Sequence, residues 1–253
     1  MRVLSIMPFL LALAVAAAAG EGSLSIAPAV VMLRGVAGQS TTQTMKLTNT
    51  SSRPFSFDLK AQDIIVRDGH RVFVDAGQIP GSIAASASFS RKSVTLAPGE
   101  SVRVDVTVTI PVKPSSRAVL ALFRGTTKLE HGSIGATVSL GTLLTFALSD
   151  EVLSSTTALD VHPPTATSNL AVAQQLANSG NEPFVATGML AIINSGGTLV
   201  GRTPIPPRRL LPGERTDVHA EYAGELARGH YRALMTYQLA ATSVTSSAEF
   251  DVR

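Results

Sequence analysis

The chain contains no cysteine and no tryptophan, and only 5% of its residues are aromatic. Without cysteine it has no thiol nucleophile, no disulfide and no cysteine-linked lipid. Few aromatic rings leave little surface on which nucleic-acid bases or sugars could stack. Basic and acidic residues are nearly balanced, 21 against 18, so the charge does not favour a nucleic-acid partner.

Motifs of catalytic and metal sites are missing as well. The five histidines show no H-E-x-x-H spacing, and neither a G-x-S-x-G elbow nor a glycine-rich phosphate loop occurs. Asp63, Asp68 and Asp75 are loosely grouped, which favours solvated turn carboxylates over a calcium site. We therefore expect a non-enzymatic protein without metal or cofactor.

The first residues predict an export signal. Met1 and Arg2 precede an apolar run from Val3 to Ala19, which ends in an A-x-A pattern at Ala17–Ala19. A membrane anchor is the alternative, but the run is short for a span and ends in small alanines. We expect a signal peptide over residues 1–20, cleaved on export, and no membrane insertion afterwards, because no second long apolar run follows.

The rest of the chain has the pattern of β-strands. Between Val102 and Ile110, β-branched apolar residues alternate with polar ones, which is typical of a half-buried strand. Asp68-Gly69 separates two such strands and predicts a tight hairpin. Pro98-Gly99 and Pro212-Gly213 suit type II turns, because proline presets the first central φ and glycine accepts a positive second one.

Three motifs occur twice in the same order. This internal repeat predicts two copies of one domain type, over residues 21–150 and 151–253. Short strands separated by turn residues predict the fold class: all-β, two tandem Ig-like antiparallel β-sandwiches. The paired motifs are LTNTSSRPF (47–55) with LANSGNEPF (176–184), LAPGE (96–100) with LLPGE (210–214), and SRAVLAL (116–122) with HYRALMT (230–236).

The first copy is longer between its asparagine and its Pro-Gly turn. Asn49 to Pro98 contains about fifteen more residues than Asn178 to Pro212. The additional residues include the Asp68-Gly69 hairpin and a stretch over residues 77–88. Insertions in repeats usually form loops, and loops often carry function.

Two sets of segments carry resemblances to known families: the first comprises residues 26–31 with Pro28, 45–49, Pro54-Phe55, 94–100 and 102–111, and the second comprises 178–180, 212–214 and 229–233. Through the first set, the first copy resembles the first domain of the periplasmic pilus-chaperone (PapD-like) superfamily. Through the second set, the two-domain organisation is also similar to bacterial cell-surface proteins with paired Ig-like domains, of the type associated with WxL proteins.

The resemblance to pilus chaperones implies an anchor for the C-terminal carboxylate of a client protein. The family's first-strand arginine would fall near Ala29 or Val30 and is absent here. Other cations that could supply such an anchor are Arg34, Lys113, Arg117 and Lys128.

A late strand of the first domain has an alternating apolar pattern that suits strand addition. If it lies at a sheet edge, its free backbone groups could pair with a client strand while its side chains contact the client. The alternative is that these residues pack the core of their own sandwich. They are Val138, Leu140, Leu144, Phe146 and Leu148.

These observations lead to two functional hypotheses. The first is a periplasmic chaperone or assembly factor that binds envelope or surface proteins, fimbrial subunits among them, by β-strand addition. The alternative is a structural module at the cell surface that recognises a protein partner or peptidoglycan through the insertion. Both are binding roles of an exported protein, and neither involves nucleic acid.

Overall fold

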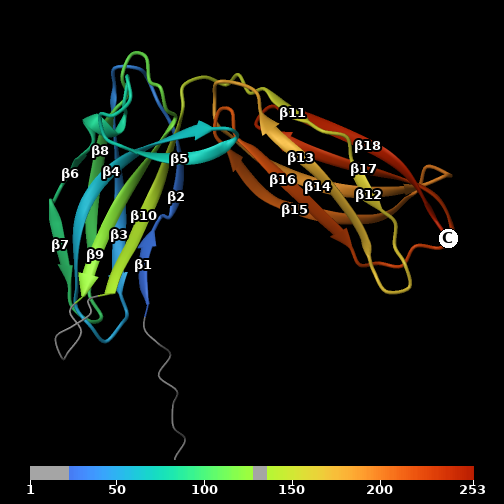
Figure 1. Ribbon diagram of the computed structural model, residues 1–253, viewed down its shortest axis with the longest axis horizontal. Helices are drawn as coiled ribbons and strands as arrows, with labels where there is room; N and C mark the ends of the chain where they lie inside the picture. Colours follow the sequence, from blue (N-terminus) through green and yellow to red (C-terminus); the bar gives the residue numbers. More distant parts are fainter. Residues whose placement is uncertain (1–22, 128–135) are drawn as a thin grey trace, which may run out of the picture.

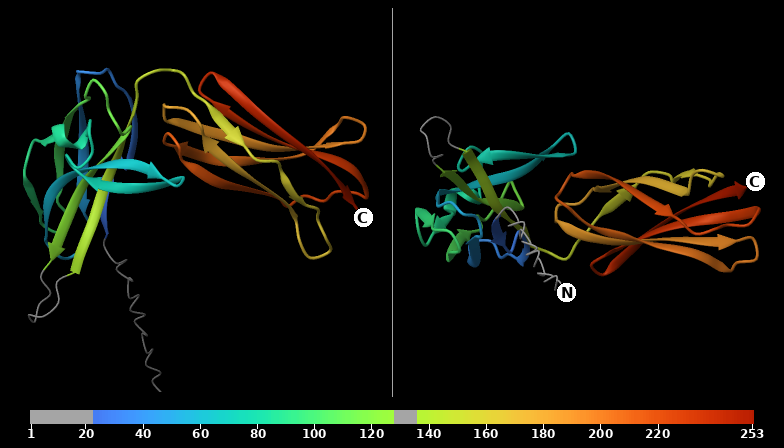
Figure 2. Two further views of the ribbon diagram at one scale, coloured as in Figure 1. Left: turned by 45° about the horizontal axis from the view of Figure 1, so that its top comes forward. Right: turned by 90° about the horizontal axis from the view of Figure 1, so that it is seen from below.

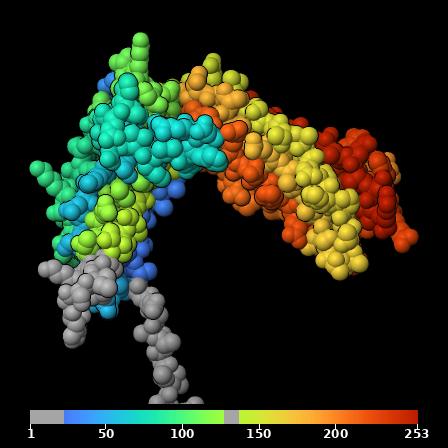
Figure 3. Space-filling model, viewed as in Figure 1, coloured from blue at the N-terminus to red at the C-terminus, as the bar shows by residue number. Residues whose placement is uncertain are grey.

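The computed structural model describes residues 23–127 and 136–253. The predicted signal peptide, residues 1–20, and the anchor candidate Lys128 lie outside the described residues. Within them the chain forms two β-sandwiches in sequence order, as predicted (Figure 1). Figure 3 shows the sandwiches as two lobes set at an angle, with a hollow between them.

The first sandwich consists of two sheets and one short 3₁₀ helix. One sheet has the order β1-β3-β8-β6, and the other has the order β2-β10-β9-β4-β5, with β7 also pairing β4. The elements are β1 (Leu24–Ala27), β2 (Val30–Arg34), β3 (Ser40–Asn49), β4 (Phe55–Arg67), β5 (His70–Asp75), η1 (Ala84–Ser86), β6 (Ser88–Phe89), β7 (Ser93–Leu96), β8 (Ser101–Thr109), β9 (Ala118–Thr127) and β10 (Ala136–Ala147).

The second sandwich also has two sheets. In one, β13 pairs with β11, β12 and β16; the other has the order β15-β14-β17-β18. Its strands are β11 (Ser154–Thr156), β12 (Asp160–His162), β13 (Leu170–Asn178), β14 (Phe184–Asn194), β15 (Leu199–Leu210), β16 (Arg215–Tyr222), β17 (Gly229–Leu239) and β18 (Thr242–Val252).

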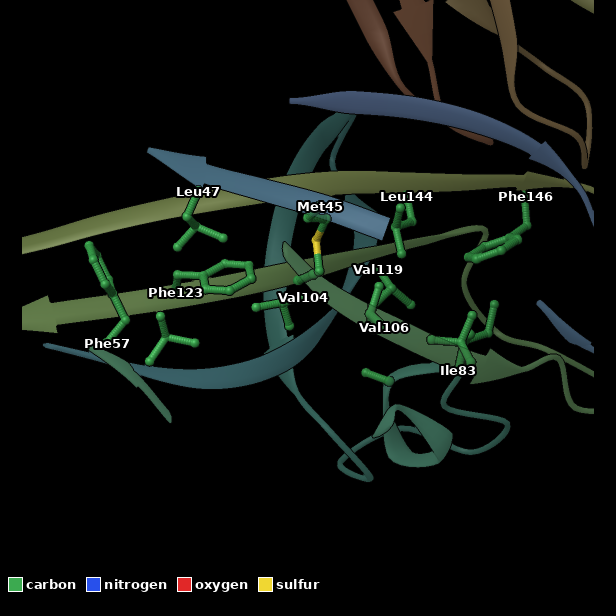
Figure 4. Packing of buried hydrophobic residues seen from close by; sticks show 14 of the residues in the cluster. Met45, Leu47, Phe57, Ile83, Val104, Val106, Val119, Phe123, Leu144 and Phe146 are labelled. Atoms are coloured by element: carbon green, nitrogen blue, oxygen red, sulfur yellow. The ribbon is translucent and has the colours of Figure 1, made fainter. Parts of the chain in front are cut away.

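Alternation along the strands builds each core. In β8 the side chains of Val104, Val106 and Val108 are buried, while the residues between them face outward. They meet the large side chains of the facing sheet, among them Phe123 and Phe146 (Figure 4). Burial of this apolar surface is the main stabilising contribution in a chain without disulfides.

The repeated motifs form equivalent corners in the two sandwiches. In each corner the Nδ2 of the asparagine donates to the carbonyl four residues later and to a carbonyl just before the Pro-Gly turn. The glycine N–H of each turn donates back to the asparagine carbonyl. The acceptors of Nδ2 include Arg53 (2.7 Å) and Leu96 (3.2 Å) for Asn49, and Glu182 (2.8 Å) and Leu210 (3.2 Å) for Asn178.

The predicted turns are present. Asp68 (φ 54°) and Gly69 (φ 85°) join β4 to β5, and Gly99 and Gly213 have φ values of 77° and 79° after their prolines. The expectation that Asp63 is a solvated turn carboxylate was wrong. Asp63 is fully buried on β4 because its carboxylate holds the inserted loop through four hydrogen bonds, from Ser82 Oγ (2.5 Å), Ile83 N (3.0 Å), Ala84 N (3.2 Å) and Ser116 Oγ (2.9 Å).

Candidate functional site

Strand β10 has one side that is only partly paired. Its pairing with β9 covers residues 136–145, but its pairing with β2 begins only at Leu143 and runs to Ala147. The chain before β2 leaves this sheet, because β1 pairs with β3 in the other one. Within the described residues, no strand covers the outer side of β10 from Ala136 to Thr142.

Among residues 23–127 and 136–253, the backbone groups on this open edge have no strand partner. Leu143 N–H donates outward to the Ala29 carbonyl (2.9 Å), whereas Phe146 N–H donates towards β9. Because successive residues of a strand direct their N–H and C=O groups to opposite sides, those of residues 137, 139 and 141 face the open edge. Residue 141 is glycine, and a Cβ at this position would collide with the Leu120 side chain of β9.

The predicted strand-pairing residues fall into two groups. Val138 and Leu140 on the open stretch and Leu148 just after β10 are half-buried, and all three pack against the margin of the first sandwich's core. Leu144 and Phe146 are 0% exposed, and their backbone lies between β9 and β2. The prediction of client contact is therefore corrected for these two side chains, which pack the core of their own sandwich (Figure 4).

A cavity of about 480 Å³ lies between the sandwiches, where β2 covers β10. Its apolar wall comes from the first sandwich, where Val30 is 48% exposed and Leu143 is half-buried. Its opposite wall comes from β15 and the corner that follows it. The lining residues of the second sandwich are Val185, Pro207, Arg208, Arg209, Glu214 and Thr216, and Arg71 is added by β5.

Three arginines and one glutamate give this cavity a positive balance. Arg71 Nε lies 2.8 Å from Glu214 Oε1, and Arg71 Nη2 donates to the Arg209 carbonyl (2.8 Å). Partial burial, followed by the positive charge of Arg71, lowers the pKa of Arg209. Arg209 Nε is buried without a hydrogen-bond partner among the described residues.

The predicted carboxylate anchors lie elsewhere. Arg34 is paired with Asp150 (2.5 Å) at the exposed end of β2, and this contact raises the pKa of Arg34. Arg117 lies near Glu182 (3.5 Å), and Lys113 is exposed. None of these three lines the cavity with Arg208 and Arg209. Arg117 instead lines a second cavity, together with Asn181, Leu211 and Pro212.

Arg208 and Arg209 are site residues that sequence reasoning missed. The available signal was their adjacency, since Arg208-Arg209 is one of two adjacent basic pairs of the chain, the other being Arg91-Lys92. Their position opposite β2 depends on how the two sandwiches meet, which no local pattern reveals.

No group of three or more His, Asp or Glu side chains in the described part of the chain could hold a metal ion. In residues 23–127 and 136–253, no helix combines the length and apolar character needed to cross a membrane.

No family model matches the chain, and the search of curated proteins finds no match. Solved structures do match at low sequence identity, and several pilus or fimbrial chaperones are among them. The class 5 fimbriae chaperone CfaA is 14% identical with a TM-score of 0.44, and the match covers 91% of this chain and 99% of that chain.

Two further matches cover similar shares of both chains. The E. coli chaperone DraB is 13% identical with a TM-score of 0.41, covering 92% of this chain and 98% of that chain. A chaperone–tip adhesion subunit complex, CsuC-CsuE from archaic Csu pili of Acinetobacter baumannii, is 8% identical with a TM-score of 0.42, covering 90% and 97%.

Proposed function

We propose that this protein is a non-enzymatic, exported chaperone or assembly factor that binds an extended client segment along β10. The open edge of β10 from Ala136 to Thr142 carries the proposal. Its free N–H and C=O groups supply main-chain hydrogen bonds, and Val138 and Leu140 supply apolar contacts beside them. The periplasm is the expected location, and fimbrial subunits are among the expected clients.

The cavity between the sandwiches supplies the second half of the proposal. A client strand added to β10 would continue the line of β2, whose Val30 lines the cavity together with Arg208 and Arg209. A terminal carboxylate of the client would there meet guanidinium donors, which bind carboxylates strongly. This pair replaces Arg34, Lys113, Arg117 and Lys128 as the proposed anchor.

A direct test uses Val138→Ser with Leu140→Ser and a matched control, Leu199→Ser with Val200→Ser. The control residues are an exposed leucine and valine on β15 of the second sandwich. The probe is a fluorescent peptide of alternating apolar and polar residues with a free C-terminal carboxylate. We expect the first variant to weaken binding by about tenfold or more, and the control to bind as the parent does.

Backbone pairing is tested separately with Ser139→Pro. Proline removes an N–H that faces the open edge and leaves the bonds to β9, so peptide binding should be lost while the sandwich stays folded. Arg208→Ala with Arg209→Ala should weaken binding of the peptide that has a free C-terminal carboxylate. Binding of the same peptide with an amidated C-terminus should not change. Unchanged binding in Ser139→Pro, with the native circular dichroism spectrum, would refute strand addition.

The alternative is a cell-surface module that binds its partner through the insertion. The structure leaves less of the insertion's surface accessible to a partner than the sequence suggested. The Asp68-Gly69 hairpin contacts the second sandwich, and Asp63 holds the loop over residues 82–84. Sedimentation of the protein with purified peptidoglycan tests this alternative. Binding that disappears when the loop over residues 77–88 is shortened would favour it over the chaperone.

A further inference from the structure

The hairpin between β4 and β5 leaves the first sandwich and reaches the second one. Figures 1 and 2 show it extending across the space between the two sandwiches, and Figure 3 shows its atoms meeting the second sandwich. At its tip the carbonyl of Gly69 accepts a hydrogen bond from Arg215 N (3.0 Å), and the carbonyl of Asp68 accepts one from Arg215 Nη2 (2.8 Å).

The tip is shaped for this contact. Gly69 is buried although it lies in a hairpin turn, and a Cβ at this position would collide with the guanidinium group of Arg215. Two backbone carbonyls of one sandwich therefore bind one arginine of the other, with backbone and side-chain donors both used.

A second set of contacts joins the stem of the hairpin to the second Pro-Gly-Glu corner. Arg71 on β5 bonds the Arg209 carbonyl and pairs with Glu214, whose side chain is only 14% exposed. Beside this pair, Leu211 is buried against Ile64 of β4 and Ala118 of β9. The apolar part of this contact is small, so the polar contacts carry much of its specificity.

A separate contact lies at the linker. Leu148 N donates to Glu182 Oε2 (2.7 Å), and Arg117 lies 3.5 Å from the same carboxylate group. This contact adjoins the segment between Ala147 and Ser154, so alone it would still permit rotation of one sandwich about that segment. Domains joined by a small interface move relative to one another by default, and a second, separate attachment removes this freedom.

We propose that the hairpin over residues 68–71 is an interdomain latch that holds the two sandwiches at one angle. The latch keeps Arg208 and Arg209 opposite β2 and β10, and its release frees the sandwiches without unfolding either one. The latch sets only the angle between the sandwiches, and this role does not depend on whether the cavity binds a client.

The test measures the distance between spin labels on the two sandwiches by pulsed electron paramagnetic resonance. The chain contains no cysteine, so Lys46→Cys on β3 and Ser247→Cys on β18, both exposed, give unique labelling sites. The latch variant is Arg71→Met with Arg215→Met. The matched control is Arg67→Met with Arg202→Met, which removes the same charge at one hairpin position and one β15 position, both exposed.

We expect one narrow distance distribution in the parent and the control, and a broadened or shifted distribution in the latch variant. A latch variant with the parent's distribution would overturn the proposal. Should that variant lose the circular dichroism of the folded protein, Glu214→Gln decides in its place by the same two outcomes, because it removes the ion pair with Arg71 while the amide oxygen can still accept the hydrogen bond from Leu211 N.

Discussion

The corner of Asn49 in the first sandwich and the corner of Asn178 in the second use the same bonds in different surroundings. Both asparagines are buried, and in both corners the glutamate of Pro-Gly-Glu accepts a hydrogen bond of 2.8 Å from the N–H three residues earlier. Within the described parts of the chain the Glu100 carboxylate has no further partner and is exposed, whereas Glu214 also pairs with Arg71.

The residue before the proline also differs between the two corners, in its exposure to solvent. Ala97 is exposed at the free end of the first sandwich, whereas Leu211 is 1% exposed at the interface. The repeated motif therefore specifies a corner, and what packs on it decides whether that corner also joins the sandwiches. The comparison of the two corners predicts changes in the free energy of unfolding, which follow from the largest to the smallest.

The largest effect should come from the asparagines, where the two corners are alike. Asn49→Ala and Asn178→Ala each leave buried carbonyls without a donor, so each should lower the free energy of unfolding by about 3 kcal/mol. Urea unfolding measures this, with the exposed Asn169→Ala as control. A loss below about 1 kcal/mol at either corner, in the range of ordinary surface changes, would show that the corners are not equivalent.

A smaller effect should separate the corners. Leu211→Ala removes buried apolar contacts with Ile64 and Ala118, and should lower the free energy of unfolding by about 2 kcal/mol, the low end for buried leucines, because the cluster is small. The matched change at the free corner, Ala97→Ser, should lie within about 0.5 kcal/mol of the parent. Equal effects at the two positions would contradict the assignment of Leu211 to the interface.

The smallest effect should appear where the third repeated motif diverges. Ser116 of the first copy is buried and donates to Asp63, whereas His230 of the second is exposed and bonds Asp251 (3.0 Å). The bond to Asp251 raises the pKa of His230 above its ordinary 6.5. The resulting stabilisation is fully present below pH 6.5 and is lost as the pH rises through the raised value.

Thermal unfolding of the parent and of His230→Gln across this pH range measures that small contribution. The parent should lose its advantage over the variant as the pH rises. A difference between them that does not change with pH would rule out the charged histidine as its source.

Much of the fold was predictable from the sequence because its signals are local. The alternation from Val102 to Ile110, the Asp68-Gly69 turn and both Pro-Gly-Glu corners are properties of neighbouring residues, and the structure has them where expected. The site was less predictable. An alternating apolar pattern is the same for a core strand and for an edge strand, so it could not separate Leu144 from Leu140.

The amino-acid sequence alone determined that the chain folds as two similar β-sandwiches, since strand period, turn chemistry and an internal repeat act over short distances. Only the tertiary structure decided which side of β10 is open, that Arg208 and Arg209 face β2, and that a hairpin of one sandwich binds the other. Those features depend on contacts between residues up to about 150 positions apart, which no local pattern records.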